Sequence, residues 1–106
     1  MTAEHVVVTT TVDSEEAANA LASGAIEARL GACAQIVGPV TSVFRWAGAV
    51  KTASEWRVEI KTTARRAPEV TGYFQANHSY ELPEVVVTPI EGGSAAYLTW
   101  LEEETR

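Results

Sequence analysis

Hydrophobic residues recur with two different periods along the chain, and the change of period separates strands from helices. His5 to Val12 is a nearly unbroken β-branched run, which predicts a central strand covered on both faces. We expect Asp13 to cap the helix that follows, Glu16 to complete a capping box, and Gly31 to end the helix in the left-handed conformation. The apolar residues of this helix fall three and four positions apart: Ala18, Leu21, Ala22, Ala25, Ile26 and Leu30.

The middle of the chain predicts a long bent strand, a turn and a further strand. Residues 32–37 and 40–46 both have an extended pattern, and Gly38-Pro39 between them indicates a bend. Residues 47–49 form the turn. Residues 55–61 alternate strictly between charged and apolar side chains, as in a strand with one buried face. The apolar set is expected in the core and the charged set on the opposite face: Trp56, Val58 and Ile60, then Glu55, Arg57, Glu59 and Lys61.

The last third of the chain predicts a helix, a strand and a final helix. Pro68 suits the first turn of the second helix, whose inner face carries Val70, Tyr73 and Phe74. Val85 to Val87 forms the last main strand, which Pro89 and the glycines at 92 and 93 end. Ser94 is expected to cap the last helix, and its closing acidic run, residues 102–104, is expected to be frayed and solvated.

The predicted order of elements is strand, helix, strand, strand, helix, strand and one more helix. This order is typical of the ferredoxin-like split βαβ sandwich, an α+β fold, so we expect residues 1–106 to form a single domain of this type with an additional C-terminal helix. Helices then cover one face of the sheet only. The other face would expose Val-rich strands, and such an apolar patch marks an interface, so we expect other subunits to cover it.

Charge and cysteine content narrow the classes of partner. Eight Lys and Arg against fourteen Asp and Glu give a net charge of -6, which disfavours nucleic acid and anionic membranes. The single cysteine, Cys33, has no internal disulfide partner and suits core packing. The N-terminal pattern lacks a secretory signal, and no apolar stretch reaches the roughly 20 residues of a membrane-spanning helix. We therefore expect a cytoplasmic protein.

Candidate chemistry gathers just before the last strand. Residues 78–84 offer an imidazole, a phenol and two carboxylates at the start of an apolar run. His78 and Glu81 are candidate ligands for copper or another divalent metal, with further ligands shared between subunits. The alternative for His78 is a helix-end histidine that bonds the last carbonyls. His5, at the start of the first strand, is expected to be a solvated terminal residue.

Other polar and aromatic residues allow two interpretations each. At the subunit boundary, a polar cluster can either bind an anion or only lock strands together; its members are Lys61, Tyr80, Glu81 and Glu84. Trp46 is expected to serve packing or a subunit contact rather than ligand stacking. No nucleophile lies in a recognisable catalytic setting, so we do not expect an enzyme.

Three segments resemble the CutA-like divalent-cation-tolerance family: residues 29–48, 55–63 and 78–101. The last is the most specific, because Tyr80-Glu81-Leu82-Pro83-Glu84 is followed by a valine run, Pro89-Ile90, a glycine pair and Tyr97-Leu98-Thr99-Trp100-Leu101. The resemblance implies a ferredoxin-like subunit in a tight homotrimer, similar in architecture to the PII signalling proteins, with long strands that cross subunit boundaries. Some relatives carry a cysteine near the end of the first strand, where this chain has only threonines at positions 9–11.

The resemblance also implies a link to divalent-metal tolerance, chiefly of copper. The first hypothesis is a trimer that binds divalent metal weakly in clefts between subunits through His78 and Glu81. The second is a PII-like sensor or scaffold whose clefts bind a small anionic ligand or a partner protein through Arg45, Lys61 and Tyr80. The two hypotheses differ in the charge of the ligand.

Overall fold

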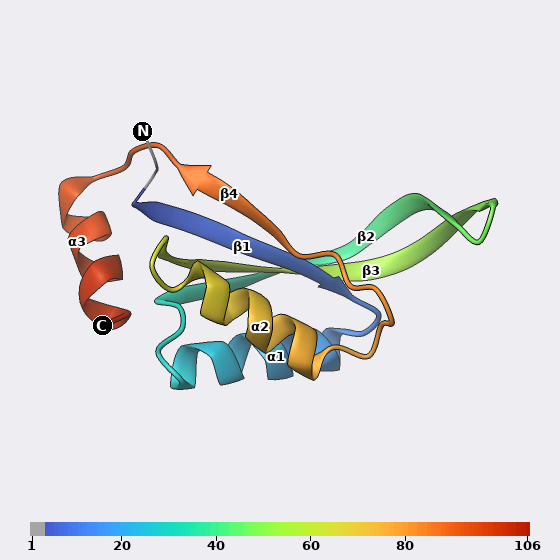
Figure 1. Ribbon diagram of the computed structural model, residues 1–106, viewed down its shortest axis with the longest axis horizontal. Coiled ribbons are helices and arrows are strands. Elements are labelled where there is room, and N and C mark those ends of the chain that lie inside the picture. The colour runs from blue at the N-terminus through green and yellow to red at the C-terminus, as the bar shows by residue number, and fades with distance from the viewer. Residues whose placement is uncertain (1–3) are drawn as a thin grey trace.

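The computed structural model describes residues 4–106, which form one antiparallel sheet and three helices (Figure 1). The strand order is β2-β3-β1-β4, and every neighbouring pair is antiparallel. This is the α+β split βαβ arrangement, and the predicted fold class is confirmed. The elements are β1 (His5–Val12), α1 (Glu15–Glu27), β2 (Cys33–Trp46), β3 (Ala49–Thr63), α2 (Ala67–Asn77), β4 (Val86–Ile90) and α3 (Ala95–Glu104).

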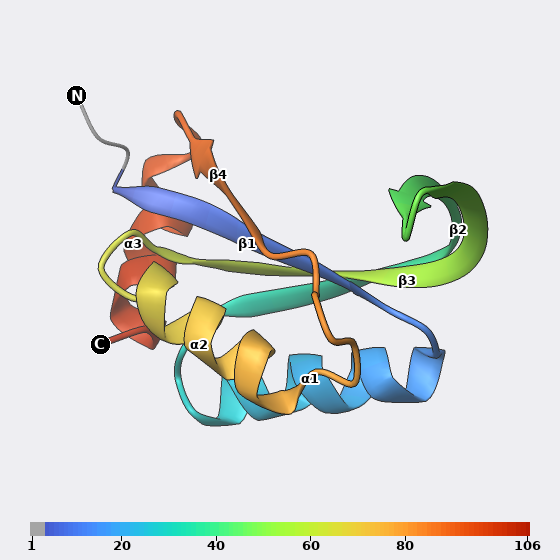
Figure 2. The same cartoon turned by 45° about the vertical axis from the view of Figure 1, so that its right-hand side comes forward.

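The core lies between the sheet and the helix pair α1 and α2, which run side by side below β1 in both ribbon views (Figures 1 and 2). β1 is central because it pairs with β3 along its whole length and with β4 over residues 5–9. The buried apolar residues come from both layers: Val6, Val8, Val12, Val58 and Ile60 from the strands, and Ala18, Leu21, Ala22, Ala25, Val70 and Phe74 from the helices.

The alternating pattern of β3 predicts its core-facing side correctly, because all three apolar residues pack in or against the core. Val58 and Ile60 are fully buried, whereas Trp56 is only half-buried. Glu55, predicted on the face opposite the core with the other charged residues of β3, is not exposed to solvent as they are: it is only 7% exposed. Its carboxylate accepts a hydrogen bond from a tyrosine far along the chain, which the strand pattern does not reveal.

The N-cap of α1 is Ser14, not Asp13. The helix begins at Glu15, and the Ser14 hydroxyl oxygen accepts a hydrogen bond from the Ala17 N–H at 3.1 Å. The predicted cap of the last helix is confirmed, since the Ser94 hydroxyl oxygen accepts from the Tyr97 N–H.

The left-handed residue at the C-terminus of α1 lies two positions before the predicted Gly31. Arg29, with φ of 60°, takes the left-handed position, and its N–H donates to the Ile26 carbonyl while the Leu30 N–H donates to the Ala25 carbonyl. These bonds form a Schellman motif. Gly31 instead permits close packing: a Cβ there would lie 2.3 Å from the Ile60 Cγ2 atom and 3.3 Å from the Lys61 carbonyl oxygen.

Strands β2 and β3 form a long hairpin that projects beyond the helices and curls at its tip (Figures 1 and 2). The predicted bend in β2 is confirmed by a register shift between Val37 and Val40, where the Gly38-Pro39 bond is cis. The predicted turn is confirmed at Ala47 and Gly48, which both have positive φ, as a type I′ hairpin turn requires, and Ala49 already belongs to β3. β3 is longer than expected because it pairs with β2 as far as the turn.

The last two elements differ from the prediction at their ends. Pro89 lies within β4 and does not end it, which is tolerated because β4 is an edge strand. The end of α3 is held in place and is not frayed. Thr105 is fully buried, its hydroxyl donates to the Leu101 carbonyl, and its own carbonyl accepts from the Arg66 Nε atom at 2.8 Å.

Replacing Gly31 with Ala tests the close approach between the α1–β2 connection and β3. The added methyl group overlaps Ile60, and overpacking of this kind costs about 1–3 kcal/mol of unfolding free energy. The matched control is Gly92→Ala, because a Cβ at position 92 meets no atom within 4 Å. Urea unfolding of both variants measures the difference, and equal midpoints for the two would contradict the packing argument.

Candidate functional site

The segment predicted to carry the site, residues 78–84, is a loop between α2 and β4 that lies against the β2–β3 hairpin. Loop and hairpin enclose an open groove with a volume of about 930 Å³. Its lining mixes apolar, hydroxyl and charged side chains: Thr11, Ser42, Val43, Phe44, Trp46, Lys51, Glu55, Ser79, Tyr80, Glu81, Leu82, Pro83 and Glu84. A hollow of this size, apolar with a few polar groups, is typical of a small-molecule site.

His78 anchors the loop to the sheet. Its Nε2 atom lies 2.8 Å from the Thr11 carbonyl oxygen, and its Nδ1 atom accepts a hydrogen bond from the Tyr80 N–H at 3.1 Å. The Nε2 atom therefore carries the proton and donates it to Thr11. His78 is a helix-end residue, as the alternative interpretation expects, but its partner is a strand carbonyl. Coordination of a metal by His78 would require one of these two bonds to break.

Tyr80 links the loop to β3 through the buried carboxylate of Glu55. The phenol donates to the Glu55 Oε2 atom at 2.8 Å. Burial first, and then this hydrogen bond and the negative charges of Glu55 and Asp13, raise the pKa of Tyr80 well above its ordinary value. The phenol stays protonated, so it acts as a structural donor at neutral pH.

The structure brings only part of the predicted cleft set together. Trp46, Tyr80, Glu81 and Glu84 line the groove. Lys61 does not: it lies six residues from Glu55 along β3, roughly 20 Å away, and its Nζ atom donates to the Gln35 side chain at 2.7 Å. Lys61 and the loop therefore do not meet within one chain, and the cluster predicted at the subunit boundary stays a prediction.

The remaining cleft candidate, Arg45, is exposed near the hairpin tip and does not line the groove either. The Thr10 hydroxyl donates to the Glu84 carbonyl at 2.6 Å, so the threonines at the end of β1 hold the loop.

Three carboxylates, Glu55, Glu81 and Glu84, line the groove together with one ammonium group, that of Lys51. The net charge of the groove favours a cation over an anion.

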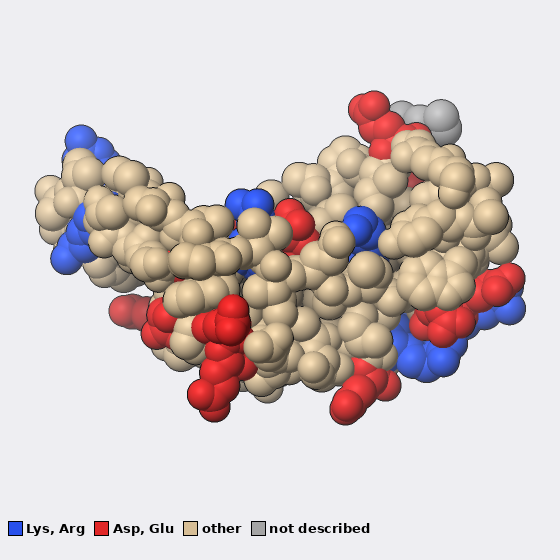
Figure 3. All heavy atoms as spheres, turned by 180° about the vertical axis from the view of Figure 1, so that it is seen from behind, with Lys and Arg blue, Asp and Glu red and all other residues tan. Residues whose placement is uncertain are grey.

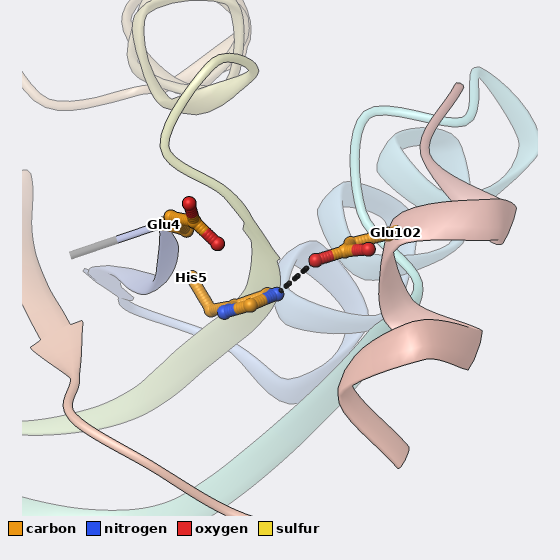
Figure 4. Close-up of side chains that lie close together, drawn as sticks. All are labelled: Glu4, His5 and Glu102. Atoms are coloured by element: carbon orange, nitrogen blue, oxygen red, sulfur yellow. Dashed lines mark hydrogen bonds and ion pairs between the residues drawn. The ribbon is translucent and has the colours of Figure 1, made fainter. Parts of the chain in front are cut away.

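A second polar cluster lies at the start of β1, where the sequence predicts a solvated histidine. That prediction is wrong, because His5 is only 8% exposed. Its Nε2 atom lies 2.8 Å from the Glu102 Oε1 atom of α3 (Figure 4). The Glu4 carboxylate lies beside the same ring, and one ligand atom from each of the three residues falls within 4.8 Å of the others.

This cluster had no signal in the local sequence. His5 and Glu102 are 97 positions apart, and only the packing of α3 against the sheet brings them together. The one available hint is compositional, since a histidine beside a glutamate begins the first strand and an acidic run ends the last helix.

A further surface feature is the number of large apolar side chains exposed to solvent. Seen from behind the view of Figure 1, much of the surface is neither acidic nor basic, and some of the Lys and Arg side chains gather at the hairpin end (Figure 3). The exposed apolar residues lie on the hairpin, the loop, β4 and α3: Val37, Val43, Phe44, Trp46, Val50, Leu82, Val86, Val87, Tyr97 and Trp100.

Within residues 4–106, none of the helices combines the length and apolar character needed to cross a bilayer.

Comparison with known proteins gives a consistent match across the chain. Residues 6–104 match the family model described as CutA1 divalent ion tolerance protein. The chain is 42% identical over 99 residues to the divalent-cation tolerance protein CutA of Thermus thermophilus, covering 93% of this chain and 96% of that protein. It is 41% identical over 105 residues to the chloroplastic protein CutA of Arabidopsis thaliana, covering 99% of this chain and 58% of that longer protein.

Solved structures agree with the sequence matches. The crystal structure of CutA1 from Oryza sativa superposes with a TM-score of 0.94 at 41% identity, covering 99% of this chain and 96% of that chain. The divalent cation tolerance protein Cut A1 from Thermus thermophilus superposes with a TM-score of 0.92, also at 41% identity, and covers 96% of this chain and 99% of that one.

Replacing Tyr80 with Phe tests the bond to Glu55 and its pH dependence. The free energy of unfolding at pH 7 should fall by about 1.5–3 kcal/mol, the usual range for a hydrogen bond to a charged group. Because the pKa of Tyr80 is raised in the folded protein, the unfolded chain loses this proton first, near pH 10. The stabilisation is therefore complete below about pH 10 and is lost as the pH rises further.

Urea unfolding of the wild type and Tyr80→Phe between about pH 8 and pH 11 measures this effect. The stability gap between the two proteins should narrow above about pH 10. Ser79→Ala, on the same exposed loop, serves as the control that leaves stability unchanged. A gap that stays constant across the alkaline range would contradict the assigned role of the phenol.

Proposed function

The chain belongs to the CutA1 divalent ion tolerance family, and from this premise we propose that it is a homotrimer that binds divalent metal, copper among them, weakly in clefts between its subunits. It acts in the cytoplasm as a binding protein and not as an enzyme. The observation that carries the metal part of this proposal is the groove with three carboxylates against one lysine. Carboxylates are hard ligands with modest affinity for copper, so weak binding follows.

Trimer assembly is supported by the apolar side chains that the isolated chain leaves in water. Val43 and Val50, on the projecting hairpin, are 67% and 63% exposed, and Leu82 on the loop is 71% exposed. A monomeric soluble protein rarely exposes a contiguous apolar patch of this kind. A neighbouring subunit that covered the hairpin would close the groove and turn it into a cleft between subunits.

Within this cleft, Glu81 and Glu84 are the ligands we propose, together with groups from a neighbouring subunit. Both side chains are exposed in the single chain and line the groove. His78 remains a candidate ligand, but its two hydrogen bonds make positioning of the loop its first role. Within residues 4–106 the groove carboxylates do not converge on one point, so groups from a neighbouring subunit would have to complete the three or four ligands of a durable transition-metal site.

A second candidate function is that of a PII-like sensor or scaffold with a small anionic ligand or a partner protein in the cleft. The size of the groove favours a molecule larger than a metal ion. Lys51 lines the groove and can receive an anionic group, whereas the predicted Lys61 and Arg45 do not reach it. Tyr80 is already bonded to Glu55.

Light scattering after size-exclusion chromatography tests the assembly. The wild type should have three times the chain mass of 11.4 kDa, and Val43→Asp should shift the protein to the mass of one chain, because a charge then enters the covered surface. The matched control, Gln75→Asp, places the same charge on the exposed side of α2 and should remain a trimer. A well-folded wild type of one-chain mass would overturn the proposal.

Calorimetric titration with copper chloride tests the metal function. Glu81→Gln should remove the weak phase of binding, because it deletes a carboxylate ligand and keeps the side-chain size. His78→Gln tests whether the histidine is a metal ligand or only positions the loop. If copper affinity falls as much as in Glu81→Gln, His78 is a ligand, and if it falls less, His78 is a positioning residue. If small organic acids or nucleotides raise the melting temperature and copper does not bind, the second function replaces the first.

A further inference from the structure

We propose that Glu4, His5 and Glu102 form a binding site for one divalent transition-metal ion within a single chain. None of the three lines the groove. Among residues 4–106, this is the one group of three His, Cys, Asp or Glu side chains whose ligand atoms converge, all within 4.8 Å of one another. The inference rests on the divalent-cation binding proposed above and gives it a location that needs no partner subunit.

The contact between His5 and Glu102 is close to the geometry of two ligands on one ion. Their Nε2 and Oε1 atoms are 2.8 Å apart. Two ligands of a tetrahedral zinc ion, each bonded at about 2.0–2.1 Å, lie about 3.3 Å apart. If the His5 and Glu102 ligand atoms move apart by about half an ångström, their hydrogen bond is lost and each atom can bond to the same ion. Glu4 is exposed, so its side chain can rotate toward the same point.

Two of the three ligands stand on rigid elements. His5 pairs with Thr63 of β3 on one side and with Ile90 of β4 on the other, so its backbone is fixed within the sheet. Glu102 follows Leu101, which is fully buried beneath α3. The turn after Glu102 is tied down by the bond from Arg66 to the Thr105 carbonyl. Ligands held in this way need little reordering when an ion binds.

The charge of the cluster is not balanced within the described chain. Two carboxylates face one imidazole, and within residues 4–106 neither Glu4 nor Glu102 forms an ion pair with a lysine or arginine. His5 is more than nine-tenths buried, and the hydrogen-bond partner of its ring is Glu102 itself. A divalent cation would neutralise both exposed carboxylates and would bind the His5 ring nitrogen, which the fold has already largely removed from water.

The donor set indicates the class of ion. One imidazole nitrogen and two carboxylate oxygens suit Zn²⁺ or Cu²⁺ and not Mg²⁺ or Ca²⁺, which prefer oxygen ligands throughout. Three protein ligands leave a fourth position open to water. Because Glu102 belongs to α3 and His5 to β1, a bound ion would also fasten the last helix to the sheet.

Calorimetric titration of the full chain with zinc chloride tests the site. The wild type should bind one tight equivalent per chain, and Glu4→Gln and Glu102→Gln should each weaken this binding at least about tenfold. The matched control is Glu103→Gln, because Glu103 is the next residue on α3 and contributes only its backbone carbonyl, to Arg29. Its zinc affinity should equal that of the wild type. The Val43→Asp variant should keep the same stoichiometry, since all ligands come from one chain.

The zinc titrations distinguish the site at Glu4, His5 and Glu102 from metal binding in the groove. Unchanged zinc affinity in both Glu4→Gln and Glu102→Gln overturns the site, and if Glu81→Gln then abolishes binding, the proposed function stands at the groove alone. Glu4→Gln changes an exposed side chain, so a folding defect cannot explain its loss of binding when its melting temperature matches that of the wild type. A wild type that binds no zinc or copper overturns both proposals.

Discussion

The central position of β1 is the constraint on which the rest of the structure depends. Its backbone is bonded to β3 and β4, and its apolar side chains Val6, Val8 and Val12 lie in the core. Both polar regions are attached to this one strand. Thr10 and Thr11 at its end form hydrogen bonds with the loop that lines the groove, and His5 at its start forms a hydrogen bond with Glu102 of α3. Any shift of β1 would therefore disturb both regions at once.

The order and type of the elements could be predicted because each depends on local periodicity. The alternation in β3, the turn at Ala47 and Gly48 and the cap at Ser94 all involve residues a few positions apart. The ends of α1 differ from the prediction because a nearby residue takes each role: Ser14 caps the helix in place of Asp13, and Arg29 is left-handed in place of Gly31 although glycine would adopt that conformation at lower cost. The sequence does not decide such choices, since backbone geometry of the whole turn selects between them.

The candidate sites were less predictable because their contacts join distant parts of the chain. The loop at residues 78–84 was predicted as the place where polar groups gather, and its residues 79–84 line the groove. Glu55 is hydrogen-bonded to Tyr80 and His5 to Glu102, and the length of β3 keeps Lys61 away from the groove. Strand alternation sorts side chains between two faces of a sheet but says nothing about position along it.

Pro89 affects the open border of the sheet. β4 is an outermost strand with exposed valines at positions 86 and 87, which would make it a ready template for the strand of another molecule. A proline offers no N–H group to an incoming backbone, so the row of donors along this border is broken at position 89. The chain can therefore keep an apolar outer strand with a lower tendency to form fibrils through edge-to-edge growth.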